Sequence, residues 1–147
     1  MTNKIEKTIS INALPFEVWE YLTDLNLMKK WMGEPEMKIE VITDWGLGNP
    51  ILIKGYHHLN FENRGTVLQF DTNKTIQYSH LSSISYLPDT IENHSIITFI
   101  LTPHEKQTLL TITVENFPTE SIYKHFDFYW QGTLIVLKNF IEQQLTG

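Results

Sequence analysis

Apolar and polar residues alternate through the middle of the chain, from about residue 36 to residue 116. In the segments 75–80 (TIQYSH) and 110–115 (LTITVE), the polar side chains Thr, Gln, Ser and Glu fall at odd-numbered positions. A period of two is typical of β-strands with one face in solvent and the other covered. We therefore predict an antiparallel meander of about six to seven strands. Turn-forming residues are expected to separate these strands at 45–50, 62–65, 71–74 and 103–106, with a looser loop at SYLPDTIEN (85–93).

Two short helices are predicted between a first strand and this meander. Residues 4–12 (KIEKTISIN) alternate broadly and give the first strand. Pro15 suits the first position of a helix, because the backbone N–H that proline lacks would have no partner there. Apolar residues follow it at helical spacing. The side chains of Thr23-Asp24-Leu25-Asn26 can cap a second helix and predict where it begins.

The last long segment, residues 119–145, has the pattern of an amphipathic helix with a broad apolar side. At about 100° per residue, its apolar residues cover roughly half of the cylinder. A helix that rests on one flat neighbour needs a narrower stripe, so we predict a curved sheet that wraps around this helix. The residues of the apolar half are Tyr123, Phe126, Tyr129, Trp130, Thr133, Leu134, Val136, Leu137, Phe140 and Ile141.

Gly132 interrupts this helix at a cost of about 1 kcal/mol relative to alanine. Its presence predicts the close approach of a strand or of a partner. Phe128 and Ile135 fall on the side of the helix that is expected to face solvent. These residues suggest a surface for a homodimer, so the chain is expected to be a monomer or a homodimer.

The order of these elements resembles the helix-grip fold of the START/Bet v 1-like (SRPBCC) superfamily. In that α+β fold a curved antiparallel sheet wraps around a long C-terminal helix. The opening segment ALPFEVWEYLTDLNLMKKW (13–31) is similar to that of the bacterial family named after the activator of the 90-kDa heat-shock-protein ATPase. RGTVLQFD (64–71) and FYWQGTLIVLKNFIEQQL (128–145) are similar to a strand and to the final helix of that family. The matching positions of the opening segment are Pro15, Val18, Trp19, Thr23, Asp24 and Trp31.

The resemblance covers nearly the whole chain and implies one domain over residues 1–147. The charge composition of the chain narrows the classes of molecule that it is expected to bind. Eleven basic and seventeen acidic residues give a net charge of −6, and the basic residues are scattered. Binding of nucleic-acid phosphates needs a basic stripe, so no nucleic-acid partner is predicted.

The sequence contains no run of about 18 apolar residues, so no membrane span is predicted. The chain has no cysteine and its start lacks the features of an export signal, so a cytoplasmic location is expected.

The resemblance implies binding of a lipid, sterol or polyketide-like molecule in a cavity between the sheet and the long helix. Aromatic rings supply buried area and their polar tips orient an amphipathic ligand. The same rings would also be found in a filled core, and that alternative stays open. From strand parity and helical spacing, the predicted lining residues are Ile53, His57, Leu68, Phe70, Tyr78, His80, Phe99, Ile112, Phe126, Trp130 and Leu134.

Histidines are the candidates for chemistry. His57 and His58 are neighbours on a strand, so they point to opposite faces and cannot ligate one metal ion; no metal and no cofactor are predicted. His80 could act as a base near neutral pH or be a hydrogen-bonded core residue. Binding without catalysis is favoured. Two alternatives are kept: a polyketide cyclase or isomerase that uses His80, His57 or Tyr78, and a chaperone-related module that binds a protein through the sheet's outer face.

Overall fold

The computed structural model describes residues 4–146. β1 (Ile5–Ile11) leads to the helices α1 (Pro15–Thr23) and α2 (Leu25–Trp31). The meander and the closing helix then follow in the predicted order. Their elements are the 3-10 helix η1 (Pro35–Met37), β2 (Glu40–Thr43), β3 (Pro50–His57), β4 (Leu59–Asp71), β5 (Thr75–Ser82), the 3-10 helices η2 (Ser83–Ser85) and η3 (Ile91–Asn93), β6 (Ser95–His104), β7 (Gln107–Glu115) and α3 (Glu120–Thr146).

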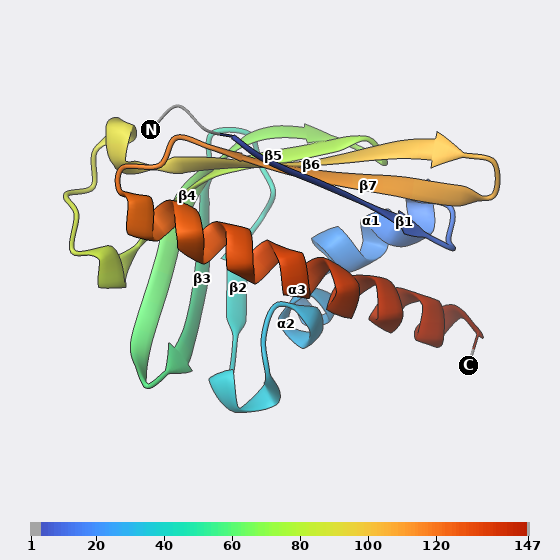
Figure 1. Cartoon of the computed structure of the whole chain (residues 1–147), viewed down its shortest axis with the longest axis horizontal. Helices are drawn as coiled ribbons and strands as arrows, with labels where there is room; N and C mark the ends of the chain where they lie inside the picture. The colour runs from blue at the N-terminus through green and yellow to red at the C-terminus, as the bar shows by residue number, and fades with distance from the viewer. Residues whose placement is uncertain (1–3, 147) are drawn as a thin grey trace.

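The seven strands form one antiparallel sheet in the order β1-β7-β6-β5-β4-β3-β2. Figure 1 shows that the sheet is strongly curved: β1, β5, β6 and β7 run roughly along α3, whereas β2, β3 and β4 turn across one end of the molecule. α3 crosses the concave side, and α1 and α2 lie on that same side. The predicted α+β helix-grip fold is therefore confirmed. None of the described helices is long and apolar enough to span a bilayer.

Local chemistry explains where the two short helices begin. The backbone N–H of Leu14 donates to the Glu17 side chain over 2.9 Å at the start of α1. The Asp24 carboxylate accepts from the backbone N–H groups of Asn26 and Leu27 over 2.9 and 3.0 Å at the start of α2. Each bond satisfies a donor that would otherwise have no partner in the chain. The predicted cap at the second helix is thus confirmed.

The turn predicted at residues 62–65 is wrong, because these residues lie inside β4. The chain reverses instead between β3 and β4 at His58, which has a left-handed backbone with a φ of 67°. Gly65 is required by the packing of two strands and not by a turn. A Cβ atom at this position would collide with the backbone carbonyl of Ser79 on β5. The glycine therefore marks the close approach of a neighbouring strand.

The register of β4 shifts once, and this shift moves Leu68 out of the core. Val67 pairs with Tyr78, whereas Gln69 pairs with Gln77, so β4 carries one extra residue at this point. Such a β-bulge breaks the alternation of inward and outward side chains. Val67 is fully buried, and Leu68 is 44% exposed. The prediction that Leu68 faces the helix is wrong, because it assumed an uninterrupted period of two.

The long helix α3 is tied to β1 by charged side chains. The Lys7 ammonium on β1 lies 2.9 Å from the Asp127 carboxylate. Further along, the Lys138 ammonium donates to the backbone carbonyl of Ser10 over 2.6 Å. These contacts lie eleven residues apart on α3, or about three turns, so β1 contacts the helix at two points along its length.

On α3, the predicted position of Val136 is wrong, and one of the two alternatives at Gly132 is excluded. Val136 is 51% exposed, although helical spacing placed it on the inner half. Apart from the two neighbouring residues and the nearby backbone of α3 itself, no atom of the described chain lies within 4 Å of the position that a Cβ of Gly132 would occupy. No strand therefore approaches this glycine closely, and the approach of a partner stays a prediction. Phe128 and Ile135 are 83% and 53% exposed, as expected for the outer side of the helix.

Candidate functional site

The middle of α3 packs into a core of aromatic and branched side chains. The Trp130 ring lies 5.5 Å from the Phe99 ring and 6.4 Å from the Trp31 ring, measured between ring centres. Besides Phe126, six of the predicted lining residues are buried in the core, and the proposal that they line a ligand cavity stays a prediction. These six are Ile53, Tyr78, Phe99, Ile112, Trp130 and Leu134.

Two other predicted lining residues, Phe70 and His57, are less buried than these six. Phe70 is half-buried and packs against Trp19 and Trp45, with ring centres 5.1 and 5.4 Å apart. His57 is exposed and lies beside His58, with ring centres 4.5 Å apart. The prediction that His57 faces into the core is wrong, because the end of the β3–β4 hairpin projects beyond the part of the sheet that α3 covers (Figure 1).

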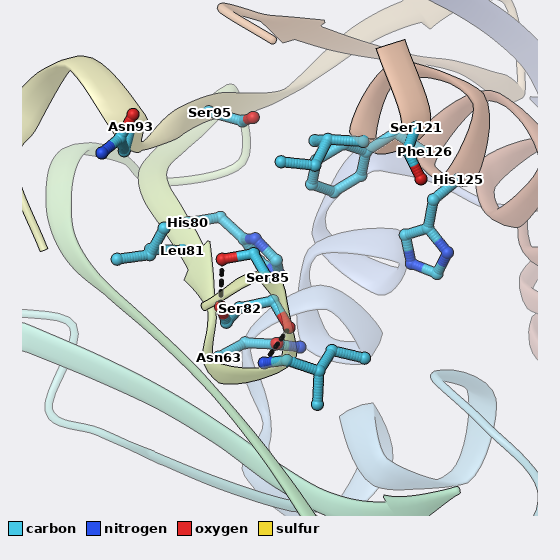
Figure 2. Close-up of a pocket in the computed structure, with 12 residues that line it drawn as sticks. Asn63, His80, Leu81, Ser82, Ser85, Asn93, Ser95, Ser121, His125 and Phe126 are labelled. Atoms are coloured by element: carbon cyan, nitrogen blue, oxygen red, sulfur yellow. Dashed lines mark hydrogen bonds between the residues drawn. The ribbon is translucent and has the colours of Figure 1, made fainter. Parts of the chain in front are cut away.

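A pocket of about 250 Å³ lies where the last residues of β5 and the helix η2 face the first turns of α3. Figure 2 shows the His80 ring directed into this space from β5, with His125 on the opposite wall. Two of the predicted lining residues, His80 and Phe126, contribute to it. The other lining residues are Asn63, Leu81, Ser82, Ile84, Ser85, Asn93, Ser95, Ser121, Ile122 and His125.

Helical spacing and a short capped turn bring these side chains together. On α3, Ser121 and His125 are four residues apart, so they lie on one face of the helix. On the opposite wall, the Ser82 hydroxyl accepts from the backbone N–H of Ile84 over 3.4 Å at the start of η2. The Ser85 hydroxyl donates to the backbone carbonyl of Ser82 over 2.7 Å. This turn holds the β5–η2 wall in place across from α3.

Several polar groups in the pocket are already used by the protein. The Ser95 hydroxyl donates to the backbone carbonyl of Asn116 over 2.7 Å. The Asn93 amide donates to the backbone carbonyl of Pro88 over 3.0 Å. Four other side chains make no hydrogen bond to another residue within the described range 4–146. These four, which we name the open polar set, are Asn63, His80, Ser121 and His125.

The two histidines of the pocket are neutral at neutral pH. Burial, with smaller contributions from His125 and His94, lowers the pKa of His80 to about 4, while a hydrogen bond to its own backbone acts in the opposite direction. Partial burial also lowers the pKa of His125, with a smaller contribution from His57. A neutral imidazole has one donor and one acceptor nitrogen. Both rings can therefore donate to and accept from a bound molecule.

The remaining lining residues determine which kinds of molecule this site can bind. Leu81, Ile84, Ile122 and Phe126 form apolar parts of its wall. No group of three histidine or carboxylate side chains that could hold a metal ion occurs in the part of the chain that the structure describes. The arrangement suits a small molecule with an apolar body and a polar group.

The sequence signal for most of this pocket was weak. Ser82, Ser85 and Asn93 lie in or beside a segment that reads as a loose loop, without the periodicity that assigns a face. His125 falls next to the apolar half of the final helix, and nothing in its spacing singles it out. The cluster of serines in SHLSSIS (79–85) is the one local feature that could have drawn attention to this end.

The fold and the pocket between sheet and helix define a START/Bet v 1-like protein. A sequence model of the family "Activator of Hsp90 ATPase homolog 1-like protein" matches residues 12–142, and the chain belongs to this family. The resemblance predicted from the opening segment is thereby confirmed. No curated protein matches the chain.

Solved structures with the same fold extend this comparison. A protein of Cytophaga hutchinsonii superposes with a TM-score of 0.80 at 32% identity, over 100% of this chain and 99% of that one. A protein of Chromobacterium violaceum gives a TM-score of 0.80 at 21% identity, over 95% and 97% of the two chains. The Aha1 dimer of Colwellia psychrerythraea gives a TM-score of 0.74 at 23% identity, over 95% and 96%.

Proposed function

We propose that this protein binds a small amphipathic molecule in the pocket between β5, η2 and α3. The observation that carries the proposal is the open polar set, which faces a space with apolar walls and makes no hydrogen bond to another described residue. Ligand sites combine a mostly apolar wall with a few polar groups that fix orientation. Membership of a START/Bet v 1-like family agrees with a ligand-binding or cyclase-like role.

The size of the pocket narrows the classes of ligand that the sequence suggested. Its volume of about 250 Å³ is below the roughly 300–1,000 Å³ of pockets that take drug-sized ligands. A molecule of one or two rings fits this space better than a sterol does. The proposal therefore favours small polyketide-like or other aromatic molecules, and it includes the cytoplasmic location expected from the sequence.

The surroundings of His80 favour ligand binding over catalysis. A general base is usually oriented by a further polar group, often a carboxylate. No Asp or Glu side chain lines the pocket. The low pKa of His80 also makes it a weak base at neutral pH. We therefore place the cyclase or isomerase function second.

Thermal unfolding with a panel of fatty acids, sterols, flavonoids and small phenols tests the proposal. A ligand that binds the native state at a hundredfold excess over its Kd stabilises it by about 2.7 kcal/mol. Ser121→Trp should fill the pocket and abolish this stabilisation. Lys124→Trp places the same side chain at another exposed position of α3, outside the pocket, and should leave it unchanged. Equal stabilisation of both variants would show that the ligand binds elsewhere.

A second proposal is self-association through the outer side of α3. Phe128, Ile135 and Val136 are 83%, 53% and 51% exposed and lie around Gly132, where a second helix could approach closely. A relative with this fold was solved as a dimer. Sedimentation analysis should find a dimer that Phe128→Lys converts to a monomer, whereas Lys124→Gln should leave the dimer intact. A wild-type monomer at high concentration would contradict the proposal.

A further inference from the structure

The wall of the pocket carries no fixed charge. Its lining residues include no Asp, Glu, Lys or Arg. Two basic residues are adjacent in sequence to lining residues. Lys124 precedes His125 on α3, and its ammonium lies 3.4 Å from the Glu120 carboxylate, outside the lining. Arg64 follows Asn63 on β4 and so points to the other side of the strand. Its guanidinium lies 3.0 Å from the Glu62 carboxylate and 3.6 Å from the Asp89 carboxylate. This cation is therefore already paired outside the pocket.

The titratable groups around His80 are themselves histidines. His125 faces it from α3, and the Phe126 ring packs edge-on against it with ring centres 5.1 Å apart. His94 also contributes to lowering the pKa of His80, and its ring lies 2.6 Å from the Asp89 carboxylate. His57, on the β3–β4 hairpin, contributes to lowering the pKa of His125. None of these groups brings a permanent positive charge into the pocket.

We propose that the pocket selects an uncharged ligand whose polar group is a hydroxyl, such as a phenol, and rejects carboxylates and amines of the same shape. The inference rests on the proposed function and names its ligand class. A hydroxyl both donates and accepts, which matches the neutral imidazoles of His80 and His125 and the hydroxyl of Ser121. A carboxylate or an ammonium would lose its hydration without gaining a counterion.

Three naphthalene derivatives of similar shape test this selectivity. 1-Naphthol is neutral at pH 7.5, 1-naphthoate is an anion, and 1-naphthylmethylamine is a cation. Their Kd values can be measured from NMR shifts of the backbone amides of residues 82–85 and 121–126. We expect 1-naphthol to bind, and the two charged probes to bind at least about tenfold more weakly because each buries an unpaired charge.

The outcomes separate this inference from the proposed function. 1-Naphthoate or 1-naphthylmethylamine binding as tightly as 1-naphthol would overturn the inference and leave a binding pocket in place. If none of the three probes shifts these amides, the proposed function is overturned and the inference falls with it.

The part played by His125 can be tested with two substitutions at this exposed position. His125→Leu removes both hydrogen-bonding nitrogens and should weaken 1-naphthol binding about fivefold, the size expected for one net hydrogen bond. Binding of unsubstituted naphthalene should not weaken. His125→Gln keeps a donor and an acceptor and should restore the affinity for 1-naphthol. Equal losses for naphthol and naphthalene in His125→Leu would show that the residue contributes only packing.

Discussion

The two ends of α3 differ in what they bury. From Trp130 onward, Leu134, Leu137 and Ile141 are buried at intervals of three and four residues and close the core. Before Phe126, Ile122 and Tyr123 continue this spacing but are only partly buried. Ser121 and His125 lie beside them on the face toward β5 and η2 (Figure 2). One helix therefore closes a core with one end and lines a pocket with the other. The boundary between the two is the point where the apolar repeat is no longer fully buried.

The curvature of the sheet explains why the pocket lies at the first end. β2, β3 and β4 turn across the molecule near the start of α3, whereas α1 and α2 lie beside its middle and later turns (Figure 1). The Tyr21 ring on α1 packs edge-on against Phe140, with ring centres 5.5 Å apart. On α2 the Trp31 ring lies beside Trp130. At the start of α3 the Phe117 ring packs edge-on against Tyr123, with ring centres 4.9 Å apart. The small polar residues Ser82, Ser85 and Asn93 line the space beside Ser121 and His125 and leave part of it unfilled.

The largest difference between the two ends should be in stability. Trp130→Ala should reduce the free energy of unfolding by about 3–5 kcal/mol, because it removes a buried ring and leaves a cavity. Ser121→Ala at the pocket should change it by no more than about 0.5 kcal/mol. Urea unfolding of both variants measures the contrast. Similar losses in the two variants would mean that the start of α3 contributes to the core as much as its middle.

The pocket end should also be the acid-sensitive end. The pKa of His80 is about 4 in the folded chain and 6.5 when unperturbed, so between these values the unfolded chain binds more protons. Stability from a neutral His80 is therefore complete above pH 6.5 and lost as pH falls, by about 2 kcal/mol between pH 7 and pH 5.

Urea midpoints at these two pH values test this linkage. His80→Gln should show a smaller loss of stability at pH 5 than the wild-type chain. His104→Gln, at an exposed position of β6, is the matched control and should keep the wild-type loss. An unchanged pH dependence in His80→Gln would assign the acid sensitivity to other groups.

The smallest expected effect concerns the ion pair that joins β1 to α3 near the boundary between the two ends. Lys7 and Asp127 are 24% and 45% exposed, so solvent screens their attraction. Lys7→Met should cost only about 0.2–1 kcal/mol. The loss should shrink further in high salt. A much larger loss in urea unfolding would mean that this pair holds α3 in place.

Sequence patterns predicted the fold because its elements are long and strongly periodic. The strands of the meander, the cap at Asp24 and the helix over 119–145 each leave a local signal. The bulge at Leu68 and the turn at His58 leave none, since both depend on how neighbouring strands align. The candidate site was predicted only through His80 and Phe126, whose positions follow regular spacing. Ser85 and Ser121 were missed because a loop and a helix start carry no periodic pattern.

The most direct test of a pocket at this end of α3 is a map of NMR amide shifts over the whole chain on addition of 1-naphthol. We expect the shifted amides to cluster at residues 80–85, 93–95 and 121–126, at the pocket end of α3. Shifts centred on residues 97–101, 110–114 and 130–137 would contradict this site. That result would mean that the ligand enters beneath the middle of the helix, between the side chains that pack there in the core.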